Sequence, residues 1–143
     1  SSTVENTVKQ GVCPDGWHVP NDAEWTQLTN YVSSQSGFVQ GNDVQYIAKA
    51  LASTTGWKSS NNNYAVGNNP SLNNATGFGT LAAGSFYDNV YTYFNYTANF
   101  WTSTEVNATS AWIRSLYYGN PKVLRYGYSG NKSGAYSVRC VQD

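Results

Sequence analysis

The sequence predicts an α+β domain, in which two helices come first and short antiparallel strands follow. Two apolar stripes of helical period, within residues 22–33 and 44–52, predict the helices. After Gly77 the pattern changes to short apolar segments, which Gly and Asn interrupt at intervals typical of an antiparallel sheet. A length of 143 residues is that of one domain.

The first helix, over residues 22–33, has a defined start. Pro20 ends the preceding segment, and Asn21 with Glu24 three residues later forms a capping box. The apolar positions on one side of this helix are Trp25, Leu28 and Val32.

The second helix, over residues 44–52, is expected to pack against the first. Its apolar face holds Val44, Ile47, Ala48 and Leu51, and Gly56 lies beyond its end. Residues 59–75 then contain many turn formers and no apolar period, which predicts a surface loop ordered mainly by hydrogen bonds from side chains to the backbone.

Five segments of the second half predict strands: 78–88, 100–105, 111–118, 122–128 and 136–142. Residues 111–118 alternate, and strand side chains have a period of two. The side chains expected to face the core are Trp112, Arg114, Leu116 and Tyr118. Those expected on the opposite face are Ile113, Ser115 and Tyr117.

The composition excludes some partners. The net charge is zero and charged residues make up 11 %, so we expect no binding to nucleic acid or to an anionic membrane surface. No apolar run approaches the roughly 18 residues of a membrane span, and no signal segment begins the sequence. Many Asn, Ser, Thr, Gly and Tyr residues and no Met favour an extracellular, β-rich module.

The two cysteines, Cys13 and Cys140, either form a disulfide or are both buried thiols. The exported character of the composition favours the disulfide. A bridge this long would stabilise the domain by about 5 kcal/mol in the chain-entropy model.

The sequence does not predict an enzyme. The single histidine, His18, has no nucleophile or carboxylate partner that a motif marks, so a structural, hydrogen-bonded role is expected. The carboxylates are scattered, and no zinc, phosphate-loop, dinucleotide or EF-hand motif is present. We therefore predict no cofactor and no metal site; a lectin-type calcium site would need several hard oxygen ligands, which no loop motif supplies.

Four segments carry a resemblance to a known family: "CPDGWHVPNDAEWTQL" at 13–28, "FWTSTE" at 100–105, "AWIRSLYY" at 111–118 and "YSVRCVQD" at 136–143. Together they resemble the Fibrobacter succinogenes major paralogous domain family, from about Cys13 to the last residue. The resemblance implies a C-type-lectin-like fold related to formylglycine-generating enzymes, with two helices packed on a twisted antiparallel sheet and long loops. In that fold the terminal strands lie together, which lets Cys13 reach Cys140.

The resemblance also implies a domain plan and a location. Residues 1–11 are expected to be a linker or an edge strand, and residues 12–143 a single C-type-lectin-like domain. Members of the family are typically exported bacterial proteins, often with this domain as a terminal module of a larger surface protein. We therefore expect an extracellular or cell-surface location.

The C-terminal part further resembles the variable regions of ligand-binding proteins that retroelements diversify at asparagine codons. Positions matching such variable sites, together with two earlier tyrosines in a polar stretch, form the predicted ligand-binding set: Val106, Asn107, Thr109, Ile113, Ser115, Tyr117, Asn120, Leu124, Tyr126, Tyr128, Ser129, Tyr91 and Tyr93. Tyr118 and Tyr136 are expected on core faces instead.

These observations predict a non-enzymatic recognition module, which binds a surface protein or glycan of another cell. Tyrosine supplies a rigid, amphipathic ring, and Ser, Gly and Asn supply adaptable hydrogen bonds, as in antibody loops. The alternatives are a carbohydrate-binding module, in which the rings stack on sugars, and a structural cap or spacer of a larger surface protein.

Overall fold

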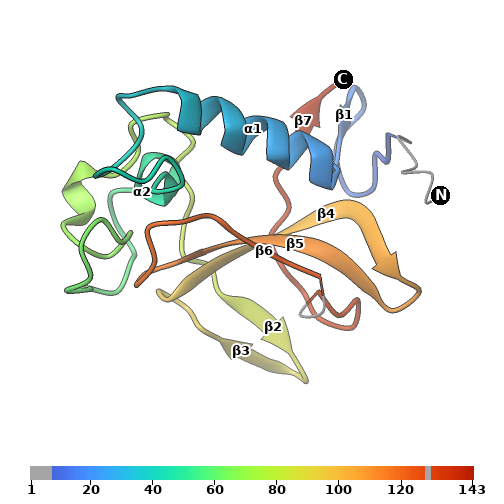
Figure 1. The fold of residues 1–143 in the computed structure, drawn as a ribbon. Coiled ribbons are helices and arrows are strands. Elements are labelled where there is room, and N and C mark those ends of the chain that lie inside the picture. The colour runs from blue at the N-terminus through green and yellow to red at the C-terminus, as the bar shows by residue number, and fades with distance from the viewer. Residues whose placement is uncertain (1–7, 128–129) are drawn as a thin grey trace.

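The centre of the fold is a three-stranded antiparallel sheet of β4 (Thr97–Asn107), β5 (Ser110–Tyr117) and β6 (Leu124–Tyr126). Helix α1 (Asp22–Ser34) lies across one face of this sheet (Figure 1). The structure is a computed structural model, which describes residues 8–127 and 130–143.

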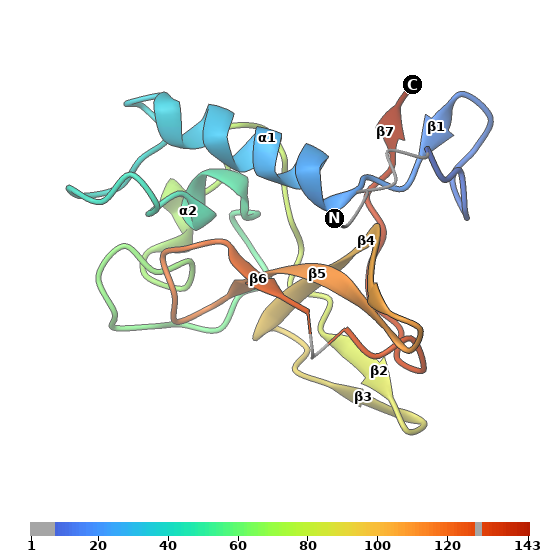
Figure 2. The ribbon, with the colours of Figure 1, turned by 45° about the vertical axis from the view of Figure 1, so that its right-hand side comes forward.

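Two smaller antiparallel sheets flank the central one. Strand β1 (Trp17–His18) pairs with β7 (Val141–Gln142), and β2 (Ser85–Tyr87) pairs with β3 (Val90–Thr92). The predicted α+β class is confirmed, but the expected single sheet is wrong, because the strands fall into three sheets. The β2–β3 hairpin stands apart from the central sheet (Figure 2).

Gly84 explains how the chain leaves the central sheet to enter this hairpin. It forms an isolated parallel bridge with Ala98 of β4 and has a left-handed φ of 71°. A Cβ at this position would lie 2.3 Å from the carbonyl oxygen of Thr92. Only glycine fits both the dihedral angle and the close approach of the returning strand.

The two ends of the described chain lie side by side. In the β1–β7 pair, Trp17 lies opposite Gln142 and His18 opposite Val141. Cys13 and Cys140 form a disulfide, which confirms the predicted pairing. Before β1, Lys9 forms an isolated bridge with Val19.

The first helix agrees with its prediction. Asn21 Oδ1 accepts a hydrogen bond from the Glu24 backbone N–H, and the Glu24 carboxylate accepts one from the Asn21 N–H. Trp25 and Val32 are buried on the face toward the sheet. Local spacing was sufficient here because a capping box and an apolar stripe are both short-range signals.

The second helix is much shorter than predicted: α2 covers only Ala48–Leu51. Before it, Asp43 forms a turn, in which its side chain accepts a hydrogen bond from the Gln45 N–H and its carbonyl one from the Tyr46 N–H. After it, Ala52 forms a parallel bridge with Thr80. A turn and a bridge thus use backbone groups that a longer helix would need.

Residues 59–75 contain one short 3₁₀ turn, Pro70–Leu72, and are held by side-chain hydrogen bonds as predicted. The prediction of a surface loop is wrong for Ala65 and Val66, which are fully buried. The reason lies in Lys49 of α2, whose buried ammonium donates to the carbonyl oxygens of Asn68 and Asn69. The loop closes over this side chain.

The predicted strand segments differ in how much of each is strand. The long pair β4–β5 contains the segment 100–105 and residues 111–117 of the segment 111–118, whereas only β2, β6 and β7 remain of the other three. Residues 135–137 instead lie between two sheets, with Ala135 opposite Phe86 and Ser137 opposite Phe100 as isolated bridges.

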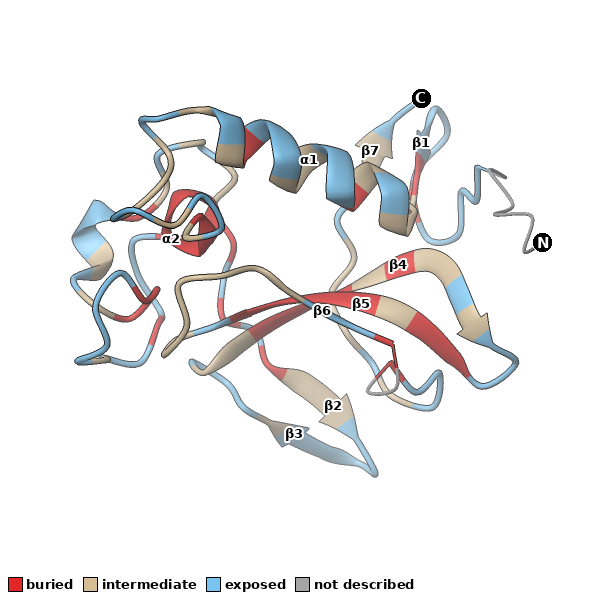
Figure 3. Ribbon diagram, in the orientation of Figure 1, coloured by how far each residue is buried: buried red, intermediate tan, exposed pale blue. Residues whose placement is uncertain are grey.

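The core lies between α1, α2 and the central sheet, where Figure 3 shows the buried residues of α2 and the middle of β5. Leu116 belongs to this core, and Arg114 points the same way, toward α1. The predicted alternation of β5 is therefore confirmed for these two side chains. Tyr118 packs against the same core, as predicted.

Candidate ligand-binding surface

A hollow of about 530 Å³ lies on the face of the central sheet opposite α1. Strand alternation places it there, because its β5 residues alternate with Arg114 and Leu116, which face the helix. We call it the tyrosine hollow, and its predicted lining residues are Tyr93, Ile113, Ser115, Tyr117, Asn120, Leu124 and Tyr126. The other lining residues are Ser85, Thr97, Asn99 and Tyr136.

Strand register brings these residues together. Thr97 and Asn99 of β4 lie opposite Tyr117 and Ser115 of β5. On the other side of β5, Ser115 lies opposite Leu124 of β6, and Ile113 lies opposite Tyr126. Side chains opposite each other in a sheet share a face, so residues from three strands line one hollow.

A fixed polar network forms the floor. The Ser115 hydroxyl donates to Asn99 Oδ1 at 2.7 Å, and Asn99 Nδ2 donates to Thr97 Oγ1 at 3.0 Å. Ser115 and Ile113 each expose only 3 % of their surface, so they shape the floor and offer little contact area. A network of buried hydrogen bonds holds its members in one orientation.

Tyrosine rings form the walls. Tyr93, Tyr117 and Tyr126 are exposed, whereas Tyr136 is half-buried and packs edge-on against Trp101 with ring centroids 4.7 Å apart. Burial raises the pKa of Tyr136, and a hydrogen bond with Tyr118 is the largest cause that raises the pKa of Tyr117. Both phenols are therefore neutral at physiological pH, and none of the lining residues carries a charge.

Some predicted residues lie outside the tyrosine hollow. Asn107 and Thr109 close the β4–β5 hairpin, where Asn107 Oδ1 accepts hydrogen bonds from the Thr109 N–H and hydroxyl. At about 3.3 Å per residue, this turn lies roughly 13 Å along β5 from Ile113, the nearest lining residue of that strand. The sequence prediction grouped Asn107 and Thr109 with the hollow residues because spacing alone does not show where a hairpin turns.

Val106 and Tyr91 also lie elsewhere. Val106 approaches Gly127 together with Trp112, on the side of the sheet away from the hollow. Tyr91 is 80 % exposed on β3 and packs against Phe86, with ring centroids 4.7 Å apart. The remaining two predicted residues, Tyr128 and Ser129, lie outside the described part of the chain.

Sequence reasoning missed Ser85, Thr97, Asn99 and Tyr136. A usable signal existed for two of them, because Thr97 and Asn99 alternate with the apolar Ala98 and Phe100. Tyr136 was assigned to the core, and that assignment is wrong: it lines the hollow. Its segment adds to the outer edge of β4 through Ser137, a non-local pairing that the sequence does not show.

His18 is buried between two carboxylates. Its Nε2 lies 2.8 Å from Glu24 Oε1, and its Nδ1 lies 2.7 Å from Asp143 Oδ1. Hydrogen bonds with Glu24 and Asp143 raise its pKa above 6.5 and outweigh the opposing effect of burial. The predicted structural, hydrogen-bonded histidine agrees with this geometry, and His18 does not line the tyrosine hollow.

Two further findings concern metals and membranes. Within residues 8–127 and 130–143, no group of three or more His, Cys, Asp or Glu side chains is placed to hold a metal ion. In the same part of the chain, no helix is both long and apolar enough to cross a membrane.

The fold and the hollow define a small disulfide-linked α+β domain with an uncharged, aromatic surface depression. The family model of the Fibrobacter succinogenes major domain matches residues 2–142, so the chain belongs to this family. The match begins before Cys13, where the resemblance was expected to start. No curated protein and no solved structure matches the chain.

Proposed function

We propose that this domain is a non-enzymatic recognition module of an exported bacterial surface protein, which binds a protein or glycan of another cell in the tyrosine hollow. The observation that carries this proposal is the convergence of four tyrosines from four parts of the chain on one uncharged hollow. Exposed aromatic side chains in a concave surface are typical of binding sites.

Two features support an exported domain of C-type-lectin-like architecture. The disulfide between Cys13 and Cys140 is of a kind that persists in oxidising compartments. The paired terminal strands and the two helices are features that the lectin-like resemblance implies. A retroelement that varies the wall positions Tyr117 and Tyr126 would change the ligand and keep the floor, whereas variation at Ser115 would also change the hydrogen bond to Asn99.

The composition of the walls favours a protein ligand. Tyr93, Tyr117 and Tyr126 are exposed and belong to three different segments of the chain. Tyrosine is enriched in protein-binding loops because it offers a large, rigid, amphipathic ring with little side-chain entropy to lose.

The half-buried polar lining supports the second candidate, a carbohydrate-binding module. Ser85, Thr97 and Asn120 offer hydroxyl and amide groups next to aromatic walls, without any charge. Neutral sugars require this combination of rings and uncharged hydrogen-bonding groups.

Binding to surface-protein and glycan arrays tests the proposal. The informative variant is Tyr117→Ala with Tyr126→Ala, and the control is Tyr31→Ala with Tyr91→Ala, two exposed tyrosines outside the hollow. Thermal melting of all three proteins verifies that they are equally folded.

We expect a ligand that the parent and the control bind and that the hollow variant loses. A ligand among the proteins supports a protein partner, and one among the glycans supports the second candidate. Equal binding by the hollow variant contradicts the placement of the site. If no array component binds the parent, a structural cap or spacer becomes the better interpretation.

A further inference from the structure

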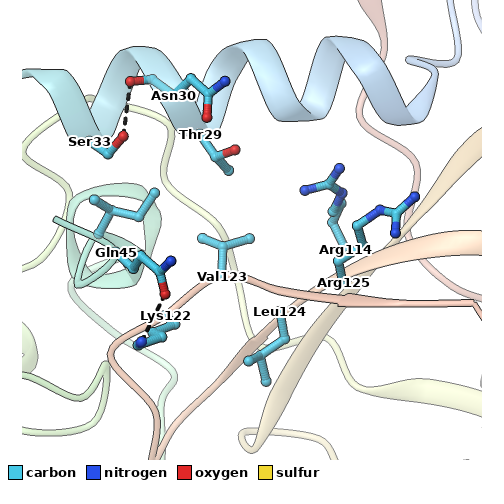
Figure 4. A pocket seen from close by; sticks show the side chains of 10 residues that line it. Thr29, Asn30, Ser33, Gln45, Arg114, Lys122, Val123, Leu124 and Arg125 are labelled. Atoms are coloured by element: carbon cyan, nitrogen blue, oxygen red, sulfur yellow. Dashed lines mark hydrogen bonds between the residues drawn. The ribbon is translucent and has the colours of Figure 1, made fainter. Parts of the chain in front are cut away.

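A second hollow, of about 370 Å³, lies between α1 and the segment that contains β6, and its chemistry is opposite to that of the tyrosine hollow. We call it the cationic cleft, since its charged lining residues are Arg114, Lys122 and Arg125. Thr29 and Ser33 of α1 and Gln45 add neutral polar groups. Figure 4 shows both arginines rising side by side toward α1, with Lys122 and Gln45 across the cleft.

The two arginines share one carboxylate. Arg114 Nη2 lies 2.7 Å from Asp22 Oδ1, and Arg125 Nη2 lies 2.8 Å from Asp22 Oδ2. Two guanidinium groups and one carboxylate leave a net charge of +1. Across the cleft, Lys122 is paired with Asp43 at 3.0 Å, which leaves that pair neutral.

The acceptors at this site are already used. Both oxygens of Asp22 accept hydrogen bonds from the arginines, and Gln45 Oε1 accepts one from Lys122 at 2.8 Å. Donors remain, because Nη1 of Arg114 and Nη1 of Arg125 have no hydrogen-bond partner among the described residues.

The burial of Arg114 makes its spare hydrogen-bond donors significant. Its side chain is only 6 % exposed, and its Nη1, which has no partner, is not among the fully buried atoms, so this nitrogen is accessible to a ligand. The position of Arg125 is fixed as well, because its guanidinium carbon lies 3.3 Å from the centre of the Trp112 ring. Two positioned guanidinium groups with spare N–H donors form the arrangement that binds oxyanions most strongly in proteins.

We propose that the cationic cleft binds an oxyanion group, a carboxylate or a sulfate or phosphate ester, on a ligand small enough for this volume. The oxyanion accepts hydrogen bonds from Arg114 and Arg125 and offsets the positive charge that Asp22 leaves uncompensated. The site lies on the other face of the sheet from the tyrosine hollow, because Arg125 of β6 points toward α1 whereas its neighbour Tyr126 lines the hollow. The two sites share one lining residue, Leu124.

Isothermal titration with sulfate at constant ionic strength, balanced with chloride, tests the proposal. The test variant is Arg125→Gln. The control is Lys132→Gln, which removes one cation of a distant exposed pair with Glu105 and so changes the net charge equally. We expect saturable sulfate binding by the parent and the control, weakened about tenfold or more in Arg125→Gln, the effect of losing one charge-assisted contact.

Equal weakening in both variants, or no saturable binding by the parent, would overturn the proposal. If Arg125→Gln does not fold, Arg125→Lys replaces it, since lysine keeps the charge but lacks the planar fork of donors, and binding as tight as that of the control then contradicts the site. Comparing sulfate with methyl glucuronide and the uncharged methyl glucoside identifies the source of the oxyanion. Tighter binding of sulfate than of the glucuronide identifies the ligand as a free ion or an ester, and tighter binding of the glucuronide identifies it as a sugar acid. If the uncharged glucoside binds as tightly as the glucuronide, the charge-based site is refuted.

Discussion

The Asp22 carboxylate at the first residue of α1 lies 2.7 Å from the guanidinium of Arg114 on β5. This ion pair joins the helix to the face of the sheet that it covers, and Arg114 also donates to the Asp22 carbonyl and to the Thr26 hydroxyl. The carboxylate is well placed within its own helix too, because a negative charge in the first turn interacts favourably with the helix dipole.

Replacing Asp22→Asn leaves Arg114 buried without its counter-charge. We expect the free energy of unfolding at pH 7 to fall by about 3 kcal/mol, as is typical when one partner of a buried ion pair is removed. Urea denaturation measures the change. The control is Glu105→Gln, which breaks an exposed pair with Lys132 and is expected to cost less than about 1 kcal/mol.

The same pair predicts an acid dependence. Burial raises the pKa of Asp22, but hydrogen bonds from Arg125 and Arg114 outweigh it and hold the pKa below 3.8. A lowered pKa means that the stabilisation is present above pH 3.8 and is lost as the pH falls through the folded-state value. The difference in stability between the parent and Asp22→Asn should therefore shrink only below pH 3.8. In the control, a loss of unfolding free energy in Glu105→Gln as large as that in Asp22→Asn would contradict the buried pair.

His18 predicts a dependence at higher pH. Its pKa is raised by hydrogen bonds to Glu24 and Asp143, so its contribution is fully present below pH 6.5 and is lost as the pH rises through the folded-state pKa. The chain has one histidine, so a single imidazole signal reports this pKa in an NMR titration. His18→Gln should remove the corresponding loss of stability, and a midpoint at or below 6.5 would refute the arrangement.

The disulfide closes a loop across 127 residues. In the chain-entropy model, removing it by Cys13→Ala with Cys140→Ala lowers the free energy of unfolding by about 5 kcal/mol. Denaturation of the oxidised parent, the reduced parent and the double variant measures this effect. The reduced parent serves as the control for the lost sulfur atoms and should resemble the variant; a loss below about 1 kcal/mol would show that the paired ends hold together without the bridge.

Lys49 predicts that the loop of residues 59–75 depends on a single ammonium group. Lys49→Met keeps the length of the side chain but leaves the carbonyls of Asn68 and Asn69 without their donor. We expect a loss of about 2 kcal/mol, the usual cost of unsatisfied buried groups. Hydrogen exchange should also become faster in this loop, whereas Lys58→Met, at an exposed lysine, should leave its exchange unchanged.

Burial also lowers the pKa of Lys49. The ammonium form of Lys49 donates to the carbonyl oxygens of Asn68 and Asn69. The sequence around Lys49 predicts only a helix, over residues 44–52. That this lysine is buried follows from the loop that returns over it, which no local pattern predicts.

The sequence by itself determined the features that depend on neighbouring residues. The capping box of Asn21 and Glu24 and the apolar stripe of α1 are set within one or two turns of helix, and the alternation of β5 is set within eight residues. The choice of Tyr117 as a surface residue also followed from sequence, because alternation and family resemblance agreed there, whereas Tyr126 followed from the resemblance alone.

Only the tertiary structure decided which of these residues meet. The end of α2, the burial of Val66 and the place of Tyr136 each depend on a partner far along the chain: Thr80, Lys49 and the edge of β4. Strand register sets the tyrosine hollow, and the two arginines that share Asp22 come from positions 92 and 103 residues away. Local patterns carry propensity and periodicity, but a site is formed by contacts between distant segments, and those arise when the chain buries its core.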